Sequence, residues 1–312
     1  MKEYIGVDIG GTKCAVCRGR GTEIFEKIKF PTTNVTETID NILDAVKKLK
    51  NENVVSVGIS CGGPLNSKTG MVLSPPNLPG WDEIPIVKLV SDAAGVPAYL
   101  CNDANACALA EWKYGAGVGT QNMVFLTFGT GLGAGLILDG KLYSGTSDMA
   151  GELGHMRLEK DGPIGYGKAG SFEGFCSGGG IAQLGREAAR KLIAKGIYPS
   201  FCPSDDEVDK ITAERIANCA KAGDEHAIEV YKQSGRMLGY GLSIVVDILT
   251  PEVICIGSIY ERSGELLEDE MRKIMEEEAL GYALDVCKVV PAKLGNMIGD
   301  VAALALAEIM GG

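Results

Sequence analysis

The feature that most constrains the fold is a short unit that occurs twice: an apolar strand pattern, a turn rich in glycine, and a second apolar strand pattern. It spans residues 4–18 around Gly10-Gly-Thr12, and residues 122–138 around Gly129-Thr-Gly-Leu-Gly133. A unit that recurs at a distance predicts two lobes built on one plan. With 312 residues the chain is long enough for two domains, and we expect a cleft between them.

The intervening segments alternate between helical and strand patterns, which is typical of an α/β fold. Apolar residues at helical spacing predict helices over 35–49, 84–94 and 105–114, and strands over 54–60 and 97–101. Beyond residue 171 we expect mainly helices, at 181–195, 213–222, 226–249 and 265–278, with a strand at 253–256. Gly115–Gly119 is a candidate hinge. The expected lobes are residues 1–118 with a final helix over 298–312, and residues 119–297.

Composition excludes several classes of function. The net charge of −11 and the pI near 4.9 provide no field that would attract nucleic acid or an anionic membrane. The sequence starts directly with a strand pattern, and no apolar run approaches the ~18 residues that a membrane span needs, so we expect a cytoplasmic protein. Most of the ten cysteines lie in apolar runs typical of buried thiols. Cys14 and Cys17 match Cys-x-x-Cys, but strand packing is favoured over a redox or metal role.

Two glycine turns have the chemistry of a phosphate site. Asp8-Ile-Gly-Gly-Thr-Lys13 combines a carboxylate at a strand end, exposed amides, a hydroxyl and an ammonium group. The amides and Thr12 can donate to phosphate oxygens, Lys13 can neutralise them, and Asp8 can hold Mg²⁺ directly or through water. The alternative is a glycine hairpin with a capping Asp. Because Gly129–Gly133 repeats the pattern, two turns that grip a triphosphate are favoured.

Polar residues elsewhere suit hydroxyl chemistry. Asn102-Asp103 follows a strand at its carboxyl end, where a carboxylate can accept the proton of an attacking hydroxyl and an amide can bind neighbouring hydroxyls. The alternative is helix capping, for which Asn and Asp are preferred. Glu152, His155 and Glu173 lie beside glycines that allow close approach to a ligand, although a structural histidine is an equal alternative for His155.

The ordered series of motifs resembles the ROK family, named for repressors, open reading frames and kinases, among the actin-like sugar kinases with the ribonuclease-H fold. The resemblance covers nearly the whole chain. It rests on Ile5-Gly-Val-Asp-Ile-Gly-Gly-Thr-Lys13, Asn77-Leu-Pro-Gly-Trp81, Asn102-Asp-Ala-Asn105, Thr127-Phe-Gly-Thr-Gly-Leu-Gly133, Gly151-Glu-Leu-Gly-His155 and Glu173.

This resemblance implies a glucokinase-like enzyme that phosphorylates a hexose from Mg·ATP, with glucose favoured and mannose or an N-acetylhexosamine as alternatives. Asp103 would take the proton of the 6-hydroxyl as general base. The remaining roles follow by position: sugar binding by Gly63, Asn77, Asn102, Glu152, His155 and Glu173, and ATP binding by Asp8, Gly10, Gly11, Thr12, Lys13, Thr130, Gly131 and Gly257. The family often has a second glycine where this chain has Ser258. A homodimer is also implied.

The chain departs from the family at its zinc site. Many members carry three cysteines between this histidine and the final Glu, whereas here the stretch reads Ile164-Gly-Tyr-Gly-Lys-Ala-Gly-Ser-Phe-Glu173. One histidine without thiolates cannot form a tetrahedral site, so zinc is not expected, although Cys176 could support a weak one. Tyr166 or a backbone carbonyl is expected to orient His155 instead. The rival function is a non-catalytic sugar-responsive regulator, but a strand that starts at Tyr4 leaves no room before it for a helix-turn-helix.

Overall fold

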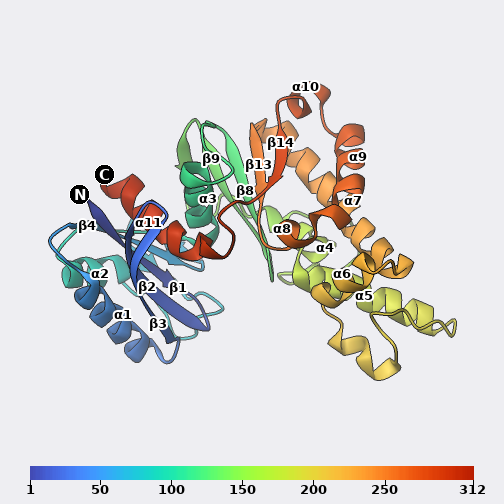
Figure 1. Cartoon of the computed structure of the whole chain (residues 1–312), viewed down its shortest axis with the longest axis horizontal. Coiled ribbons are helices and arrows are strands. Elements are labelled where there is room, and N and C mark those ends of the chain that lie inside the picture. Colours follow the sequence, from blue (N-terminus) through green and yellow to red (C-terminus); the bar gives the residue numbers. More distant parts are fainter. The chain divides into compact units, whose positions relative to one another are not determined.

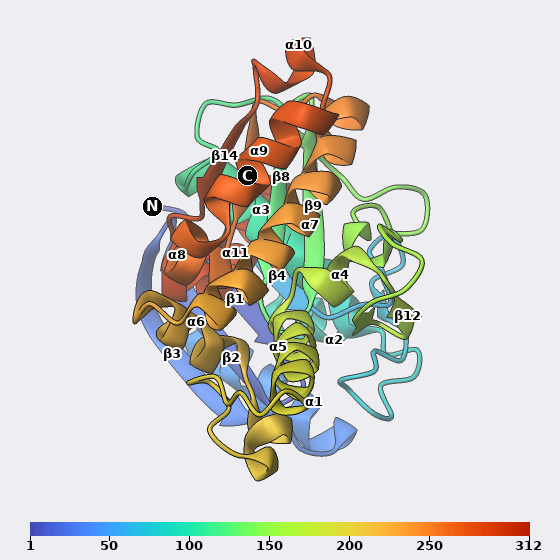
Figure 2. The same ribbon diagram turned by 90° about the vertical axis from the view of Figure 1, so that its right-hand side faces the viewer.

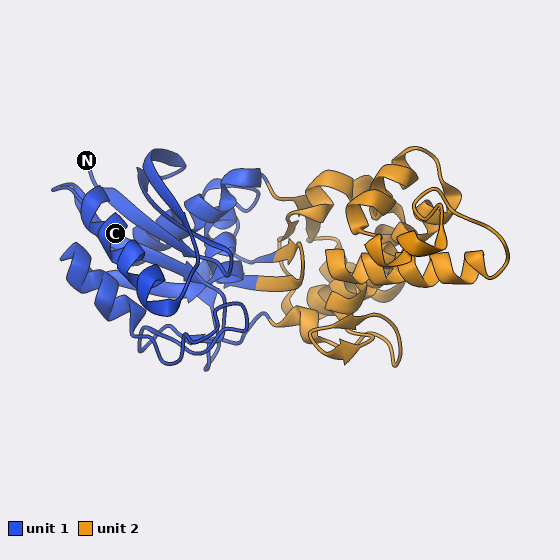
Figure 3. Cartoon of the chain, turned by 90° about the horizontal axis from the view of Figure 1, so that it is seen from below, with its two compact units in different colours: residues 1–125, 135–151, 293–312 blue, residues 126–134, 152–292 orange.

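The computed structural model describes residues Met1–Gly312 and divides them into two compact units. Unit 1 comprises Met1–Phe125, Gly135–Gly151 and Lys293–Gly312, whereas unit 2 comprises Leu126–Ala134 and Glu152–Ala292 (Figure 3). The units are not the same division as the expected lobes, because Gly135–Gly151 lies in unit 1. The expected lobe boundaries stay a prediction.

Strands and helices alternate through unit 1, and helices predominate in unit 2 (Figure 1). The strands are β1 Glu3–Ile9, β2 Lys13–Arg20, β3 Glu23–Pro31, β4 Val54–Cys61, β5 Leu65–Asn66, β6 Met71–Val72, β7 Ala98–Asn102, β8 Met123–Phe128, β9 Leu132–Leu138, β10 Lys141–Tyr143, β11 Ile164–Gly165, β12 Lys168–Ala169, β13 Val253–Ile256 and β14 Lys288–Pro291. The helices are α1 Val35–Leu49, α2 Ile86–Ala94, α3 Asp103–Tyr114, α4 Phe172–Phe175, α5 Gly178–Ile193, α6 Ala213–Lys221, α7 Glu225–Leu249, α8 Ile259–Ser263, α9 Glu268–Glu278, α10 Gly281–Leu284 and α11 Ile298–Gly311.

The repeated unit of the sequence is confirmed. The strands β1 and β2 flank the first glycine turn, and β8 and β9 flank the second. Each pair belongs to its own five-stranded sheet, with the orders β3-β2-β1-β4-β7 and β10-β9-β8-β13-β14. In the first sheet β1 pairs antiparallel with β2 and parallel with β4, which in turn pairs parallel with β7. The carboxyl ends of β1, β4 and β7 therefore meet at one edge.

The strand β1 has two buried faces. Ile5, Val7 and Ile9 belong to the core that α1 and α2 cover, because successive side chains of a strand point to opposite sides. On the other face Tyr4 clusters with Leu304 of α11. Asp8 shares the parity of Tyr4, so its carboxylate emerges at the α11 side of the sheet, at the end of the strand.

The helix α11 lies unusually close to the strands. A Cβ on Gly58 of β4 would overlap the carbonyl oxygen of Ala303, and a Cβ on Gly6 of β1 would stand 3.0 Å from the Cβ of Ala303. The Ser56 hydroxyl donates to the carbonyl of Ala307 at 2.8 Å. Helix backbone and sheet backbone therefore meet almost directly, which requires the glycines at these two positions.

A fully buried carboxylate fastens two connecting segments in unit 1. Glu111 of α3 accepts the backbone N–H of Ala116 at 2.7 Å with Oε2, and those of Lys293 and Leu294 at 3.0 and 2.8 Å with Oε1. Gly115 makes room for it, because a Cβ there would overlap Oε2. Ala116 belongs to the glycine-rich segment before β8, and Lys293 is where the chain re-enters unit 1.

Unit 2 is built around α7. This 25-residue helix packs against α9 and α6, and α5 lies beside α6 (Figure 2). Gly241 of α7 lies against the ring of Phe172, where a Cβ would overlap the ring carbons. Tyr231 of α7 donates its hydroxyl to the carbonyl of Ala213, the first residue of α6, at 3.0 Å. These contacts fix the starts of α4 and α6 against the long helix.

Two further expectations concern the state of the cysteines and the presence of membrane-spanning helices. The ten cysteines form no disulfide and seven of them are buried, Cys14 and Cys17 among them on β2. Burial raises the pKa of Cys17 to about 12, so its thiol is protonated at neutral pH, which fits strand packing rather than redox or metal chemistry. None of the helices has both the length and the apolar character that a membrane crossing demands.

Candidate functional site

The first glycine turn is fixed by hydrogen bonds at Gly10 and exposed to solvent at the residues that follow. The N–H of Gly10 donates to the carbonyl of Lys13, and Thr32 donates its hydroxyl to the carbonyl of Gly10 at 2.6 Å. Gly11, Thr12 and Lys13 are exposed. A Cβ on Gly11 would stand 2.5 Å from the carbonyl oxygen of Asn77, so only glycine permits this approach. The turn thus presents a hydroxyl, an ammonium group and backbone amides, as the sequence predicts for a phosphate site.

Asp8 carries the most informative electrostatics in unit 1. Burial, followed by the charges of Asp300 and Asp103, raises the pKa of Asp8 to about 6, while Lys27 and Lys13 act in the opposite direction. Asp8 and Asp103 are therefore close enough for their negative charges to repel each other. A divalent cation would relieve that repulsion, and carboxylate oxygen is the ligand type that Mg²⁺ prefers.

Asn102 and Asp103 take separate roles at the β7–α3 junction. Asn102 is the N-cap of α3, because its Oδ1 accepts the N–H of Asn105 at 2.7 Å. Capping therefore holds for Asn102, although its amide nitrogen can still donate to a ligand. Asp103 begins the helix with an exposed side chain and accepts the N–H of Ala104 at 2.9 Å. Surrounding protein still desolvates its carboxyl enough to raise the pKa of Asp103.

Two loops of unit 1 complete the predicted sugar side. Leu78 and Trp81 are buried, and they anchor the Asn77-Leu-Pro-Gly-Trp81 loop while Asn77 itself is exposed. No heavy atom lies within 4 Å of the Cβ position of Gly63, so this backbone faces open space. Asn77 and Gly63 are thus accessible on unit 1, as are Asp103 and the first turn.

In unit 2, Glu173 supports the second glycine turn. Its Oε2 accepts the N–H of Leu132 at 2.9 Å, and a Cβ on Gly131 would stand 2.7 Å from the same oxygen. The turn is also joined to the start of α5, because Gly178 donates its N–H to the carbonyl of Gly129 at 2.8 Å. Thr130 is left exposed between these anchors. The observed contact of Glu173 is thus with a turn predicted to bind phosphate.

His155 lies on a single 3-10 turn, Leu153–His155, that packs on the same region. A Cβ on Gly154 would overlap the carbonyl oxygen of Leu132, so glycine lets the turn sit on β9. The carbonyl of His155 accepts a hydrogen bond from Lys168 Nζ at 2.7 Å. The rings of His155 and Tyr166 meet edge to face with their centroids 6.2 Å apart. Tyr166 therefore meets the imidazole in a T-shaped ring pair rather than by the suggested hydrogen bond.

The region around His155 holds no evident metal site. Residues 164–169 form the β11–β12 hairpin, and no group of three His, Cys, Asp or Glu side chains is arranged to hold a metal ion. Cys176, the candidate for a weak site, is buried and points its Sγ at the carbonyl of Ser234. The absence of zinc stays a prediction that metal analysis must test.

Unit 2 also contains a pocket of about 710 Å³ that the sequence motifs mark only in part. One face of α5 lines it, through Gly178, Ala182 and Arg186, and faces of α6 and α8 complete it. The remaining lining residues are Gly129, Thr130, Gly179, Ile211, Thr212, Ala213, Glu214, Ala217, Asn218, Lys221, Tyr231, Ser258, Ile259, Arg262 and Ser263. Of the predicted site residues only Thr130 is among them. The run Gly178-Gly-Gly180 after Ser177 was the one signal in the sequence that could have indicated the rest.

Ser258 lines this pocket, and Gly257 precedes it directly after the end of β13. Gly257 is buried and donates its N–H to the carbonyl of Leu126 at 3.0 Å. Ser258 has φ +58°, a conformation that glycine adopts more readily than serine. Its N–H donates to Oε2 of Glu261 at 2.5 Å, which helps to hold this backbone. The position is thus one where a glycine would carry less strain.

Comparisons with known proteins agree on one group. A model of the ROK family matches residues 4–309. The glucokinase of Streptomyces coelicolor is 34% identical over 317 residues, which cover 97% of this chain and 97% of that protein. The xylose repressor of Caldicellulosiruptor bescii is 31% identical over 93% of this chain and 74% of its own length.

Solved structures give the same result. A ROK family glucokinase from Streptomyces griseus, in complex with glucose and AMPPNP, has a TM-score of 0.77 and 31% identity, over 98% of this chain and 99% of the other. A ROK hexokinase from Thermus thermophilus has a TM-score of 0.79 and 28% identity, over 99% and 98%.

Proposed function

This chain belongs to the ROK family, and from that premise we propose that it transfers the γ-phosphoryl group of ATP to the 6-hydroxyl of a hexose, with glucose favoured. Its glucokinase relatives and the hexokinase structure make it a phosphotransferase that acts on a sugar hydroxyl, with the two-lobed actin-like fold. Glucose and AMPPNP in the Streptomyces griseus structure support the choice of acceptor and donor. Mannose and N-acetylhexosamines are the alternatives, the latter suggested by an N-acetylmannosamine kinase from Citrobacter koseri at 28% identity.

The proposal rests mainly on the position and the pKa of the Asp103 carboxylate. Its carboxylate is accessible at the carboxyl end of β7, and desolvation raises its pKa, which makes it a better proton acceptor than an ordinary Asp. In the proposed step the sugar oxygen attacks the γ-phosphorus, its proton passes to Asp103, and ADP leaves with the electrons of the broken P–O bond. The amide of Asn102 would bind a neighbouring hydroxyl.

Asp8 fits a role as the magnesium residue. Its partly buried carboxylate is repelled by Asp103 and Asp300, and a hard cation with oxygen ligands would remove that repulsion. Held by Asp8 directly or through water, Mg²⁺ would neutralise charge on the phosphates. Gly10, Gly11, Thr12 and Lys13 would bind phosphate oxygens from the same side.

The remaining predicted site residues are assigned by their individual positions. We propose that Glu152 and His155, both exposed beside the Leu153–His155 turn, bind ring hydroxyls together with Glu173. Gly63 and Asn77 would border the sugar from unit 1. Thr130 and Gly131 would bind phosphate, and Gly257 would support the nucleoside. A homodimer, a cytoplasmic location and the absence of nucleic-acid partners stay predictions. Light scattering coupled to size-exclusion chromatography tests the first.

The base is tested by Asp103→Asn. We expect kcat to fall at least ~100-fold, the usual scale of general-base catalysis, while sugar affinity measured by calorimetry changes little. Asp44→Asn, an exposed change on α1, is the matched control and should keep full activity. Turnover of Asp103→Asn near that of the control would refute the role.

A coupled assay across a panel of sugars tests the activity itself. Glucose, mannose, fructose, N-acetylglucosamine and N-acetylmannosamine would be compared by kcat/KM, with the highest value expected for glucose. The competing function is a non-catalytic sugar-responsive regulator, suggested by the xylose repressor relatives. Sugar binding without any sugar phosphate as product would favour that alternative.

A further inference from the structure

We propose that Arg186 reads the nucleobase of the phosphoryl donor, through a hydrogen bond from its Nε to a ring nitrogen of the purine. This inference rests on the proposed function, because it takes the 710 Å³ pocket of unit 2 as the nucleotide site. It adds a residue that no motif in the sequence marks.

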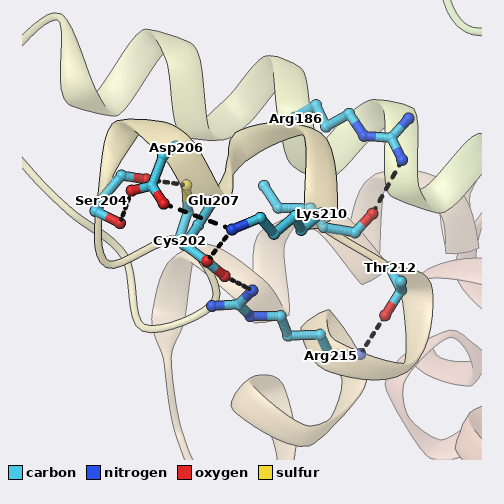
Figure 4. A network of polar contacts seen from close by, with 9 residues as sticks. Arg186, Cys202, Ser204, Asp206, Glu207, Lys210, Thr212 and Arg215 are labelled. Atoms are coloured by element: carbon cyan, nitrogen blue, oxygen red, sulfur yellow. Dashed lines mark hydrogen bonds and ion pairs between the residues drawn. The ribbon is translucent and has the colours of Figure 1, made fainter.

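The guanidinium of Arg186 is fixed but incompletely paired. Its Nη2 donates to the carbonyl of Ile211 at 3.1 Å (Figure 4). Its Nε is buried and has no hydrogen-bond partner, and the side chain forms no ion pair. Buried donors without partners are rare in proteins and destabilising, so the unpaired Nε of a residue that lines a pocket points to an acceptor that arrives with a ligand.

The acceptor of Arg186 is held rigidly. A Cβ on Gly185 would overlap the side chain of Ile216, so α5 and α6 approach each other closely beside Arg186. The segment that carries Ile211 is braced by Glu207, which binds Lys210 at 2.8 Å and Arg215 at 2.6 Å (Figure 4). These cations are already paired with carboxylates. Arg186 differs from them because it lacks such a partner, and the braced carbonyl keeps its guanidinium in the pocket wall.

Position along α5 assigns Arg186 to the base rather than to the phosphates. Gly178, Ala182 and Arg186 stand at intervals of four residues, so they follow one face of the helix along the pocket. Arg186 lies roughly 12 Å along the axis from Gly178, at 1.5 Å per residue. Because Gly178 binds the second glycine turn, where phosphates are proposed to lie, the far end of the pocket receives the base.

The surroundings of Arg186 suit a flat ring. Ala182, Ile211 and Ala217 are buried, small or branched apolar residues that line the same pocket. A purine can lie against such a surface while its edge accepts one directed hydrogen bond, which is the usual division of labour in ligand pockets. A bare polyphosphate would gain nothing from these residues.

Arg186→Lys tests the assignment by calorimetry with three probes: Mg·ATP, Mg·ADP and inorganic tripolyphosphate. Lysine keeps the charge but cannot keep both the bond to Ile211 and a donor at the position of Nε. We expect the affinities for ATP and ADP to fall about tenfold, and that for tripolyphosphate to stay within about twofold. Arg190→Lys, one turn further on α5, exposed and outside the pocket, is the matched control and should change none of them.

Equal loss for tripolyphosphate would mean that Arg186 binds phosphate, and unchanged ATP affinity would mean that it has no role; either result overturns the proposal. A second measurement needs no variant. On the wild-type protein, one among the 1-, 3- and 7-deaza analogues of ATP should bind about tenfold more weakly than ATP, and uniform affinities would also overturn it. Failure of the pocket assignment is recognised separately, because Ala217→Trp would then fill the pocket without weakening ATP.

Discussion

Replacement of Glu111 by Gln should destabilise unit 1 strongly. The carboxylate accepts three backbone N–H groups at 2.7–3.0 Å in a fully buried position. A carboxamide has only one oxygen, so in either orientation its NH₂ group faces at least one of these donors. The mutation therefore leaves a buried N–H unsatisfied, at about 1–3 kcal/mol, and weakens the remaining bonds by removing the charge. We expect a total loss of about 3 kcal/mol in the free energy of unfolding.

The tryptophans make this measurable for one unit alone. Trp81 and Trp112 are the two tryptophans of the chain, and both lie in unit 1. In urea unfolding followed by tryptophan fluorescence, a loss of about 3 kcal/mol lowers the midpoint by about 1.5 M when the slope is near 2 kcal/mol per M. Gly115→Ala should act similarly, because its Cβ would displace the Glu111 carboxylate.

The control is Glu52→Gln, the same chemical change at an exposed position of unit 1, which should shift the midpoint by less than about 0.3 M. A shift of the Glu111 variant as small as that of the control would refute the reasoning, because it would mean that the three hydrogen bonds contribute nothing net.

Three further outcomes are expected. Burial and acidic neighbours raise the pKa of Asp8 to about 6 from an unfolded value near 4, so folding stability should rise as pH falls through 6 and level off below about 4. In thermal melts of the ligand-free protein, Asp8→Asn should lose this pH dependence and gain up to about 3 kcal/mol at pH 8; an equally pH-dependent variant would contradict this. Ser258→Gly should relieve its positive φ and stabilise the protein by about 1 kcal/mol, whereas a lower melting temperature would count against strain. Elemental analysis of the purified protein should find well below one zinc atom per chain, and stoichiometric zinc would disprove the zinc-free support of His155.

The parts of the fold that sequence could predict are those fixed by local patterns. Helical spacing predicted residues 35–49, and α1 has those bounds, because a strong apolar stripe and an Asn34 N-cap act within the segment itself. The four-residue strand β14 was missed. This segment is a strand because it pairs in parallel with β13. Residues 257–287 separate the two strands, so a pattern within a short stretch of sequence cannot indicate the pairing.

The candidate site likewise has a part that local sequence predicts and a part that depends on tertiary packing. Carboxylates and glycines at strand ends, such as Asp8 and Asp103, are recognisable because strand and turn are local. The pocket is not, since it forms only when α5, α6 and α8 pack together. Arg186 has the spacing of any polar residue on an amphipathic helix, and only the folded chain reveals that its Nε lacks a partner.

The packing of α11 has a consequence for synthesis. Gly6 and Gly58 leave hollows in the first sheet that Ala303 of α11 fills, yet residues 298–311 are translated only after the whole of unit 2. While the ribosome extends the chain, one face of the first sheet stays uncovered, which exposes apolar surface to chaperones or to aggregation. Unit 2 ends at Ala292 and does not need the C-terminal residues 293–312. Its synthesis begins after that of unit 1, yet it is the first unit that can finish folding.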